Sequence, residues 1–244
     1  MSDALTARQI QILKHIIDEY IETAEPVGSE ALEKKYNLGI SPATVRNEMA
    51  GLIQKGFLKQ PHTSSGRVPT PKAMKLYVDQ LMEEKSMSIA EEVKAKEEVW
   101  DSRGNVDQLL EEATHALAEH TKSLAVATLD ASNKVWHAGY KNIFHSPEFT
   151  DSLVCESLFS LIEEVERMND LFFHRGNPLS PFDLFFGEEL GWQNLSPMGV
   201  IATRFNLGTR RGALGVIGST RLSYPRIVPI LRYYGNLLEE VASA

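Results

Sequence analysis

The sequence predicts an α+β protein with two domains. Its 244 residues exceed the usual size of one domain, and an apolar content of 43% is enough to form buried cores. Apolar residues recur at helical spacing through the first 82 residues, whereas helical segments alternate with strand-like runs from residue 105 onward. We expect a helical domain over residues 1–82 and a mixed domain over 105–244, joined by a charged helical linker over 83–104.

Charge is divided unevenly between these regions. The net charge is −8, yet residues 37–78 carry six basic side chains and one acidic side chain, Glu48. Residues 83–244 carry fifteen basic and twenty-four acidic side chains. A basic segment on an acidic protein is typical of a surface that binds phosphate groups. Nucleic acid is therefore a candidate partner of the N-terminal domain.

Composition excludes several other classes of protein. The single cysteine, Cys155, rules out a disulfide framework and a cysteine zinc site. It lies within a predicted helix with no histidine nearby in sequence, so we expect an inert structural thiol. No apolar run is long enough to cross a bilayer, and no signal peptide precedes the first helix, so we expect a cytoplasmic protein without a membrane partner.

No pattern of residues predicts catalysis. The sequence contains none of the motifs G-x-G-x-x-G, P-loop, H-E-x-x-H or G-x-S-x-G. The histidines of the C-terminal region lack metal-ligand spacing: His115, His120, His137, His145 and His174. We expect no enzyme activity, no cofactor and no metal.

The first predicted helix begins after Thr6, where Gln9 completes a capping-box pattern. It ends before Pro26, since the residue before a proline disfavours helical dihedrals. Its expected apolar stripe is Ile10, Leu13, Ile16, Ile17, Tyr20 and Ile21. A second, short helix is expected over residues 29–36, followed by a turn at 37–39.

A third helix is expected over residues 41–52, with Ser41 as N-cap and Pro42 at the first helical position. One face is apolar, comprising Val45, Met49, Leu52 and Ile53. The opposite strip combines small and polar residues that can approach DNA closely and hydrogen-bond base edges or phosphates: Ala43, Asn47, Ala50 and Gln54, flanked by Thr44 and Arg46. By itself this pattern also fits an ordinary amphipathic surface helix. The flanking sequence is needed to distinguish a DNA-binding helix from such a helix.

A hairpin follows the third helix. Residues 57–60 and 67–70 read as strands around a small polar loop, and Pro71 opens a fourth helix. A helix, a short helix, a tight turn and a capped helix followed by a hairpin form the layout of a winged helix-turn-helix domain. The loop tip, Ser64 to Gly66, would approach a phosphate backbone, and Arg67 would reach phosphate or the minor groove. The alternative is a solvent-exposed hairpin with a Ser-Gly tip that binds no DNA.

The second domain reads as helix, two strands, helix, three strands and helix. We expect helices beginning at Asn105, over 148–168 and over 224–241, with Pro229 costing the last one a hydrogen bond or bending it. Strands are expected over residues 123–129, 134–140, 182–186, 198–205 and 211–218. This order predicts an α+β sheet domain like a GAF domain.

Two runs, SPATVRNEMAGL and QPHTSSGRVPT, lie within a nearly continuous similarity over residues 5–82. They closely resemble the N-terminal winged helix of the bacterial heat-inducible transcription repressor HrcA. A looser resemblance extends through AGYKNIFHSPEFTD, DLFFGEEL and GALGVIGSTRLSYPRIVPILRYYGNLL. The resemblance implies a transcriptional repressor of chaperone genes. It would bind an inverted-repeat operator in double-stranded DNA as a homodimer and depend on a GroEL-type chaperonin.

The resemblance also implies DNA-binding residues. At the groove it places Ser41, Ala43, Thr44, Arg46 and Asn47, and in the wing Thr63, Ser64, Ser65, Gly66 and Arg67. We expect Lys72 to neutralise a phosphate.

The chain departs from the family in one respect. The family carries an inserted dimerising segment after the strand corresponding to SLAVATLD, but here Asp130 lies shortly before AGYKN. Dimerisation is therefore expected on the sheet domain or on the helix within 83–104. Two other functions remain open: a regulator that responds to a small ligand in its C-terminal domain, and a protein-interaction module that does not bind DNA.

Overall fold

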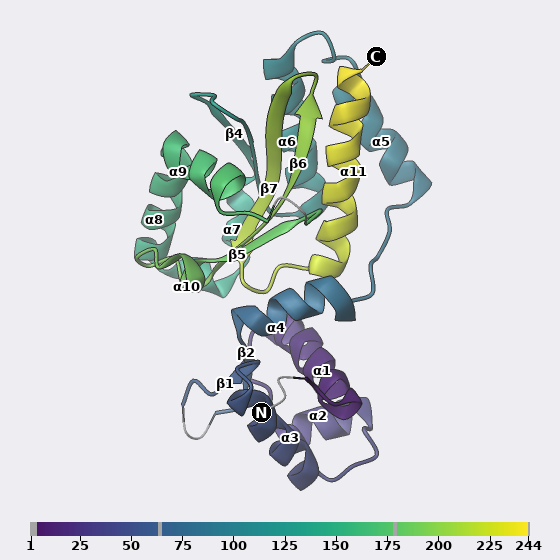
Figure 1. Ribbon diagram of the computed structural model, residues 1–244, viewed down its shortest axis with the longest axis vertical. Helices are drawn as coiled ribbons and strands as arrows, with labels where there is room; N and C mark the ends of the chain where they lie inside the picture. The colour runs from purple at the N-terminus through teal and green to yellow at the C-terminus, as the bar shows by residue number, and fades with distance from the viewer. Residues whose placement is uncertain (1–3, 63–64, 178–179, 244) are drawn as a thin grey trace. The chain divides into compact units, whose positions relative to one another are not determined.

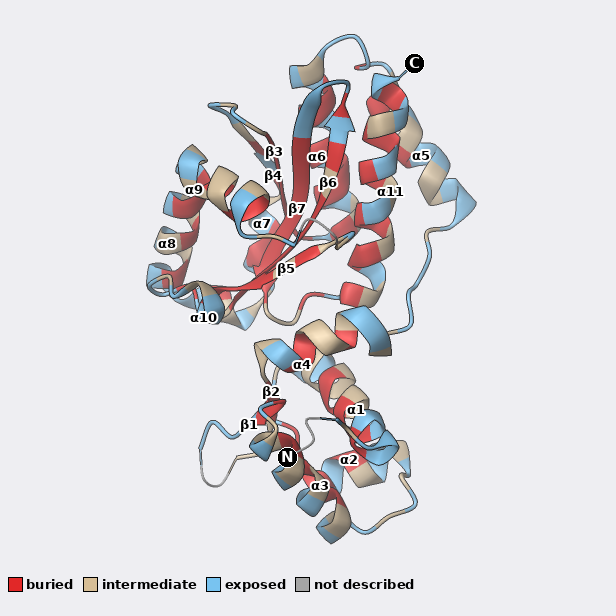
Figure 2. Ribbon diagram, in the orientation of Figure 1, coloured by how far each residue is buried: buried red, intermediate tan, exposed pale blue. Residues whose placement is uncertain are grey.

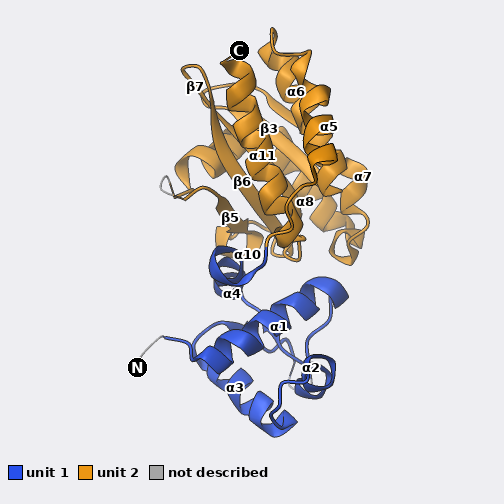
Figure 3. Ribbon diagram, turned by 90° about the vertical axis from the view of Figure 1, so that its right-hand side faces the viewer, with its two compact units in different colours: residues 1–83 blue, residues 84–244 orange. Residues whose placement is uncertain are grey.

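The computed structural model describes residues 4–62, 65–177 and 180–243. The chain forms two compact units, residues 1–83 and 84–244 (Figure 3).

The segment expected to be a linker belongs largely to unit 2. Helix α5 (Ile89–Trp100) buries Ala95 and Val99. It packs against α6 (Val106–Thr121) and α11 (Tyr224–Ala242) (Figure 1). Ser88 and Glu91 form a capping box that starts this helix. The high charge of the segment lies on its remaining surface, so composition alone concealed the packed side.

Unit 1 contains helices and one short hairpin. Its elements are α1 (Ala7–Thr23), α2 (Ser29–Tyr36), α3 (Pro42–Gln54), β1 (Leu58–Lys59), β2 (Val68–Pro69), α4 (Pro71–Leu76) and the π-helix η1 (Tyr77–Leu81). The strands are shorter than the sequence predicts. Pro61 and Pro69 lack the N–H group that a longer ladder would need.

Helix α1 begins as predicted and buries Leu13, Ile16 and Ile17 of the predicted stripe, but its buried face is shifted away from Ile10. Thr6 and Gln9 form both hydrogen bonds of the capping box. Ile10, expected in the apolar stripe, is 37% exposed and lies at the edge of the buried face. That face is formed by Gln9, Ile12, Leu13, Ile16 and Ile17.

Unit 2 is built around a five-stranded antiparallel sheet in the order β4-β3-β7-β6-β5, which confirms the α+β class. The strands are β3 (Leu124–Leu129), β4 (Val135–Ala138), β5 (Asp183–Phe186), β6 (Met198–Leu207) and β7 (Arg210–Ser219). The remaining helices are α7 (Tyr140–Ile143), η2 (Pro147–Thr150), α8 (Ser152–Glu163), α9 (Val165–Asn169), η3 (Asp170–His174) and α10 (Gly187–Leu190).

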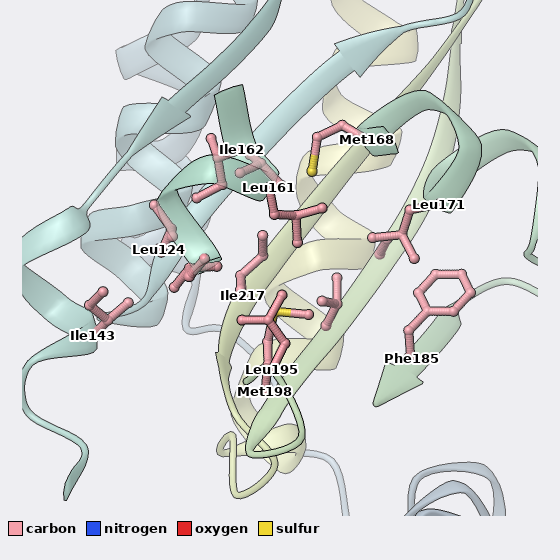
Figure 4. Close-up of a cluster of buried hydrophobic side chains, with 14 of the residues drawn as sticks. Leu124, Ile143, Leu161, Ile162, Met168, Leu171, Phe185, Leu195, Met198 and Ile217 are labelled. Carbon is pink, nitrogen blue, oxygen red and sulfur yellow. The ribbon is translucent and has the colours of Figure 1, made fainter. Parts of the chain in front are cut away.

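Helices cover both faces of this sheet. On one face, Leu124 and Ile217 pack with Leu161 and Met168 of α8 and α9 (Figure 4). On the other face lie α6 and α11, where Gly235 allows α11 to approach β6 (Figure 1). Burial on both faces explains why β3 is apolar at nearly every position.

Two predicted elements of unit 2 differ in detail. The single helix expected over 148–168 is divided, because Asp151 caps the start of α8 and Glu164 leaves helical geometry after it. The hairpin turn expected over 206–210 is only two residues long, and Gly208 supplies its positive φ of 62°.

Pro229 lies inside α11, where its missing N–H leaves the carbonyl of Pro225 without its helical partner. The backbone N–H of Lys85 donates to that carbonyl at 2.8 Å. The helix therefore continues through Pro229 to Ala242, because a segment distant in sequence satisfies the exposed carbonyl.

Candidate nucleic-acid interface

Helix α3 buries one face and exposes the other. Val45, Met49 and Leu52 are buried within unit 1. The exposed face carries Ala43, Arg46, Asn47, Ala50 and Gln54 (Figure 2). Apart from Arg46 and Gln54, this face carries only small or short side chains, so a helix lying on DNA could approach the groove closely over most of its length.

The start of α3 is fixed by its own side chains. The Ser41 hydroxyl accepts a hydrogen bond from the Thr44 N–H at 3.1 Å and lies 3.0 Å from the Thr44 hydroxyl. Ser41 therefore has a structural task as N-cap. Both hydroxyls lie at the positive end of the helix dipole, where an anion is stabilised.

Arg46 makes no hydrogen bond or ion pair with any described residue. Its side chain borders a hollow of about 220 Å³ between α3, the start of α2 and the hairpin. The hollow is lined by Val27, Gly28, Ser29, Glu30, Arg46, Met49, Ser65, Gly66 and Arg67. Since the N-cap of α2 is Gly28, no side chain caps that helix start. The hollow thus combines two arginines with an uncapped helix N-terminus.

The hairpin is held to the chain before α2. The backbones of Val27 and Arg67 exchange two hydrogen bonds of 2.9 Å. A Cβ at Gly66 would lie 2.5 Å from the Pro26 carbonyl oxygen, so only glycine fits this close approach. Sequence reasoning placed Gly66 at a DNA-facing tip and missed this packing requirement, for which the short run before α2 gave no clear signal.

Ser65, which is also predicted to lie in the DNA-binding wing, makes a hydrogen bond within the loop. The Ser65 hydroxyl donates to the His62 carbonyl at 2.7 Å and closes the base of the loop. Thr63 and Ser64 lie outside the described residues.

Two cations that are predicted to bind DNA, Arg67 and Lys72, donate hydrogen bonds to backbone carbonyls of the protein. Arg67 Nη1 donates to the carbonyls of Ser65 at 2.9 Å and Gly66 at 3.3 Å. Lys72 Nζ donates to the Lys55 carbonyl at 3.0 Å and lies 4.4 Å from the centre of the Phe57 ring. Both cations therefore brace the hairpin and the end of α3 in this structure, and Lys72 remains exposed.

The one acidic residue of the basic segment is partly neutralised. Glu48 lies 3.5 Å from Arg8 of α1. Lys55 donates to the Ala4 carbonyl at 2.7 Å and to Gln9 Oε1 at 2.9 Å. The arrangement leaves the α3 surface cationic near Arg46.

Other chemistry has little support in the described part of the chain. No group of three or more His, Cys, Asp or Glu side chains within it is placed to hold a metal ion. Burial raises the pKa of the Cys155 thiol, which donates to the Phe149 carbonyl at 3.1 Å. Among the helices described, none combines the length and apolar character required to cross a membrane.

Comparisons with known proteins point to one family. The family model of the HrcA protein C-terminal domain matches residues 72–228. The heat-inducible transcription repressor HrcA of Clostridium acetobutylicum is 56% identical over 95 residues, which cover 39% of this chain and 28% of that protein. The match therefore spans less than a third of that relative's length.

A second relative aligns along its whole length. The heat-inducible transcription repressor HrcA of Carboxydothermus hydrogenoformans is 27% identical, and the alignment covers 96% of this chain and 97% of the relative. Its 334 aligned positions outnumber the 244 residues of this chain, so a long part of the relative has no counterpart here.

A solved structure shares the fold. The crystal structure of a hypothetical protein at 2.2 Å resolution superposes with a TM-score of 0.75 at 18% identity. The match covers 98% of this chain and 99% of that chain.

Proposed function

The chain belongs to the HrcA family, and from this premise we propose that it represses heat-shock genes by binding an inverted-repeat operator as a homodimer. The exposed face of α3 carries the proposal. It offers Arg46 and Asn47 from a surface of small residues, beside a cationic hollow. The relatives named heat-inducible transcription repressors support the same function.

In this proposal, unit 1 is a winged helix-turn-helix domain. Helices α1 to α3 form the three-helix unit, and the β1–β2 hairpin is the wing. Helix α3 enters the major groove, where Ala43 permits close approach and Thr44 contacts the backbone near the helix start. Arg46 and Asn47 read base edges, because an arginine can bind guanine and an asparagine can bind adenine through paired hydrogen bonds.

The wing fixes the position of the domain on the DNA backbone. In the wing, Thr63, Ser64, Ser65 and Gly66 would contact the phosphate backbone, as the family resemblance implies. Arg67 holds the loop carbonyls and so positions the wing. Lys72 would have to exchange its contact with the Lys55 carbonyl for one with a phosphate. The contacts to phosphate supply affinity and register, and those to bases supply specificity.

Repression follows from occupancy of the operator, which excludes transcription from the adjacent promoter. Heat lowers the active fraction of repressor, and a GroEL-type chaperonin restores it, as the family resemblance implies. A cytoplasmic location follows from the same function.

The ligand-responsive alternative requires a pocket in unit 2. A hollow between α6, α7 and the end of β7 has a volume of about 170 Å³ and is lined by several serines and Asn142. Small-molecule sites usually have volumes of about 300–1,000 Å³. This hollow therefore gives the alternative little support, and thermal shifts against a metabolite panel would test it directly.

The test of the proposed function is fluorescence anisotropy on an inverted-repeat operator from a chaperone promoter, with a scrambled duplex as control. We expect a preference of about 10³-fold or more for the operator. Chaperonin should strengthen this binding, and heating should abolish it. Equal affinity for both duplexes, with folded protein and chaperonin present, would contradict the proposal.

A further inference from the structure

Helix α5 has an exposed apolar stripe in addition to its buried face. Ile89 is 81% exposed and Val93 is 51% exposed, although Ala95 and Val99 on the other side are fully buried. Trp100, which is partly buried, continues the exposed stripe about two turns beyond Val93. Residues at these spacings lie on one side of a helix, so the stripe runs the length of α5.

The stripe borders a shallow hollow that no other element covers in the described part of the chain. Its volume is about 380 Å³. All of its lining residues belong to α5 or to its C-cap: Val93, Lys96, Glu97, Trp100 and Asp101. Exposed apolar side chains of this kind cost free energy in water, which association with a second surface would recover.

The charges beside the stripe fit a second α5 in the antiparallel direction. Lys94 and Glu97 lie along one edge, and Glu92 and Lys96 lie along the other. When two such helices pair antiparallel, like edges meet with their order reversed, so each lysine comes near a glutamate of the other copy. Within one chain Lys94 already pairs with Glu98 at 3.5 Å and Lys96 with Glu240 at 2.6 Å, so the contacts between copies would be shared with these pairs. Glu97 forms no ion pair with any described residue and is free to make one. Antiparallel helix dipoles also attract each other.

We infer that the α5 stripe binds the same stripe of a second copy of this chain, with the two helices antiparallel. In this arrangement Ile89 packs against Trp100 of the second copy at both ends of the contact, and Val93 lies near the centre. The inference rests on the proposed function, since an operator with two half-sites requires two copies. It assigns the homodimer to a named surface.

The helical contact is small. Twelve residues of α5 extend over about 18 Å, which is short for a standard protein interface. The dimer formed by α5 is therefore reversible and dilutes to monomers at low concentration.

Sedimentation velocity of the full chain without DNA tests the surface. We expect the native chain to dimerise reversibly, and Val93→Asp to raise the dissociation constant of the dimer by about tenfold or more. The matched control is Leu153→Asp on α8, which alters a side chain that is 55% exposed. Circular dichroism checks that both variants are folded. A monomeric native chain, or equal weakening by both variants, would overturn the inference.

Cross-linking tests the direction of the pairing. In a Cys155→Ser background, chains with Ile89→Cys are mixed with chains with Trp100→Cys and treated with a short bis-maleimide. We expect the mixture to form linked dimers and each chain alone to form few. Self-linking of each chain alone would overturn the antiparallel arrangement.

Binding to DNA separates the two proposals. Val93→Asp should weaken binding to the complete operator and leave binding to a single half-site unchanged. A chain that dimerises through α5 but shows no operator preference would retain the inference and refute the repressor function. Specific operator binding by a dimer whose stability Val93→Asp does not change would refute the α5 inference and retain the repressor function.

Discussion

Helices α3 and α5 are nearly equal in length, 13 and 12 residues, and each packs an apolar face onto its own unit. Their exposed faces differ in chemistry. The α3 face offers Arg46 and Asn47 among alanines, whereas the α5 face offers Ile89 and Val93. Charged and amide groups stay hydrated until they meet a partner that is also polar, such as DNA. Exposed apolar groups are stabilised only by a partner that excludes water.

Different residues decide whether each of these helices forms and what its exposed face can bind. Both helices begin with a serine N-cap, Ser41 in α3 and Ser88 in α5. Only the face left open after packing distinguishes them. A substitution at the α3 surface should leave the α5 surface unchanged, and a substitution at α5 should leave α3 unchanged.

The largest expected effect lies beside the α3 surface. Gly66→Ala should lower the free energy of unfolding of unit 1 by about 3 kcal/mol, because the added Cβ would overlap the Pro26 carbonyl. The matched control is Gly28→Ala in the same hollow, where an added Cβ meets no atom within 4 Å. Urea denaturation measures both variants. Equal losses would show that the close approach at Gly66 is unimportant, and the α5 dimer should persist in either variant.

A smaller effect is expected at the α3 face itself. Arg46→Ala and Asn47→Ala should each weaken operator binding by about 1–3 kcal/mol relative to random DNA, if these side chains contact bases. Lys34→Ala removes a positive charge from α2 in the same unit and serves as control. Anisotropy titrations on both duplexes measure the change. An equal loss on operator and random DNA would assign the two residues to phosphate instead.

Lys72→Ala should weaken operator binding less than Arg46→Ala or Asn47→Ala. If it neutralises one phosphate on the operator, Lys72→Ala should reduce the slope of log affinity against log salt by about one unit. Titrations at several salt concentrations measure this slope. An unchanged slope would mean that Lys72 keeps its hydrogen bond to the Lys55 carbonyl when DNA is bound.

The smallest effect concerns the attachment of α5. Burial holds the pKa of His120 below its ordinary value of 6.5, against the opposing influence of Glu98. The His120 ring lies 3.2 Å from the Tyr234 hydroxyl and 3.7 Å from Glu98 of α5. A base with a lowered pKa in the folded state binds fewer protons there than in the unfolded state. Its contribution to the stability of unit 2 is therefore complete above the unfolded pKa and is lost as the pH falls through the folded pKa.

Denaturation of the native chain and of His120→Gln across this pH range measures that contribution. We expect the variant to lose less stability on acidification than the native chain. His15 in unit 1 also has a pKa lowered by burial, so His15→Gln is the control. If only His15→Gln flattens the pH dependence, the acid sensitivity does not come from His120.

Local sequence rules predicted many of the elements. Capping at Thr6 and Ser41 and the helix over 29–36 follow from interactions among near neighbours. The same rules predicted a continuous helix over 148–168, where Asp151 and Glu164 divide it. They also predicted that Arg67 reaches phosphate or the minor groove, and they gave no sign that its guanidinium donates to the Ser65 carbonyl in the folded chain. In both cases geometry specific to the folded chain decided the outcome.

The α+β class, the helix caps and the two faces of α3 follow from the sequence alone. These properties depend on spacings of a few residues, which the chain specifies before it folds. The tertiary structure alone decided that Lys85 satisfies the carbonyl exposed by Pro229 and that Gly66 lies against Pro26. It alone decided that α5 packs onto unit 2 with its apolar stripe open. Contacts between distant residues depend on how the elements pack, and no local pattern encodes them.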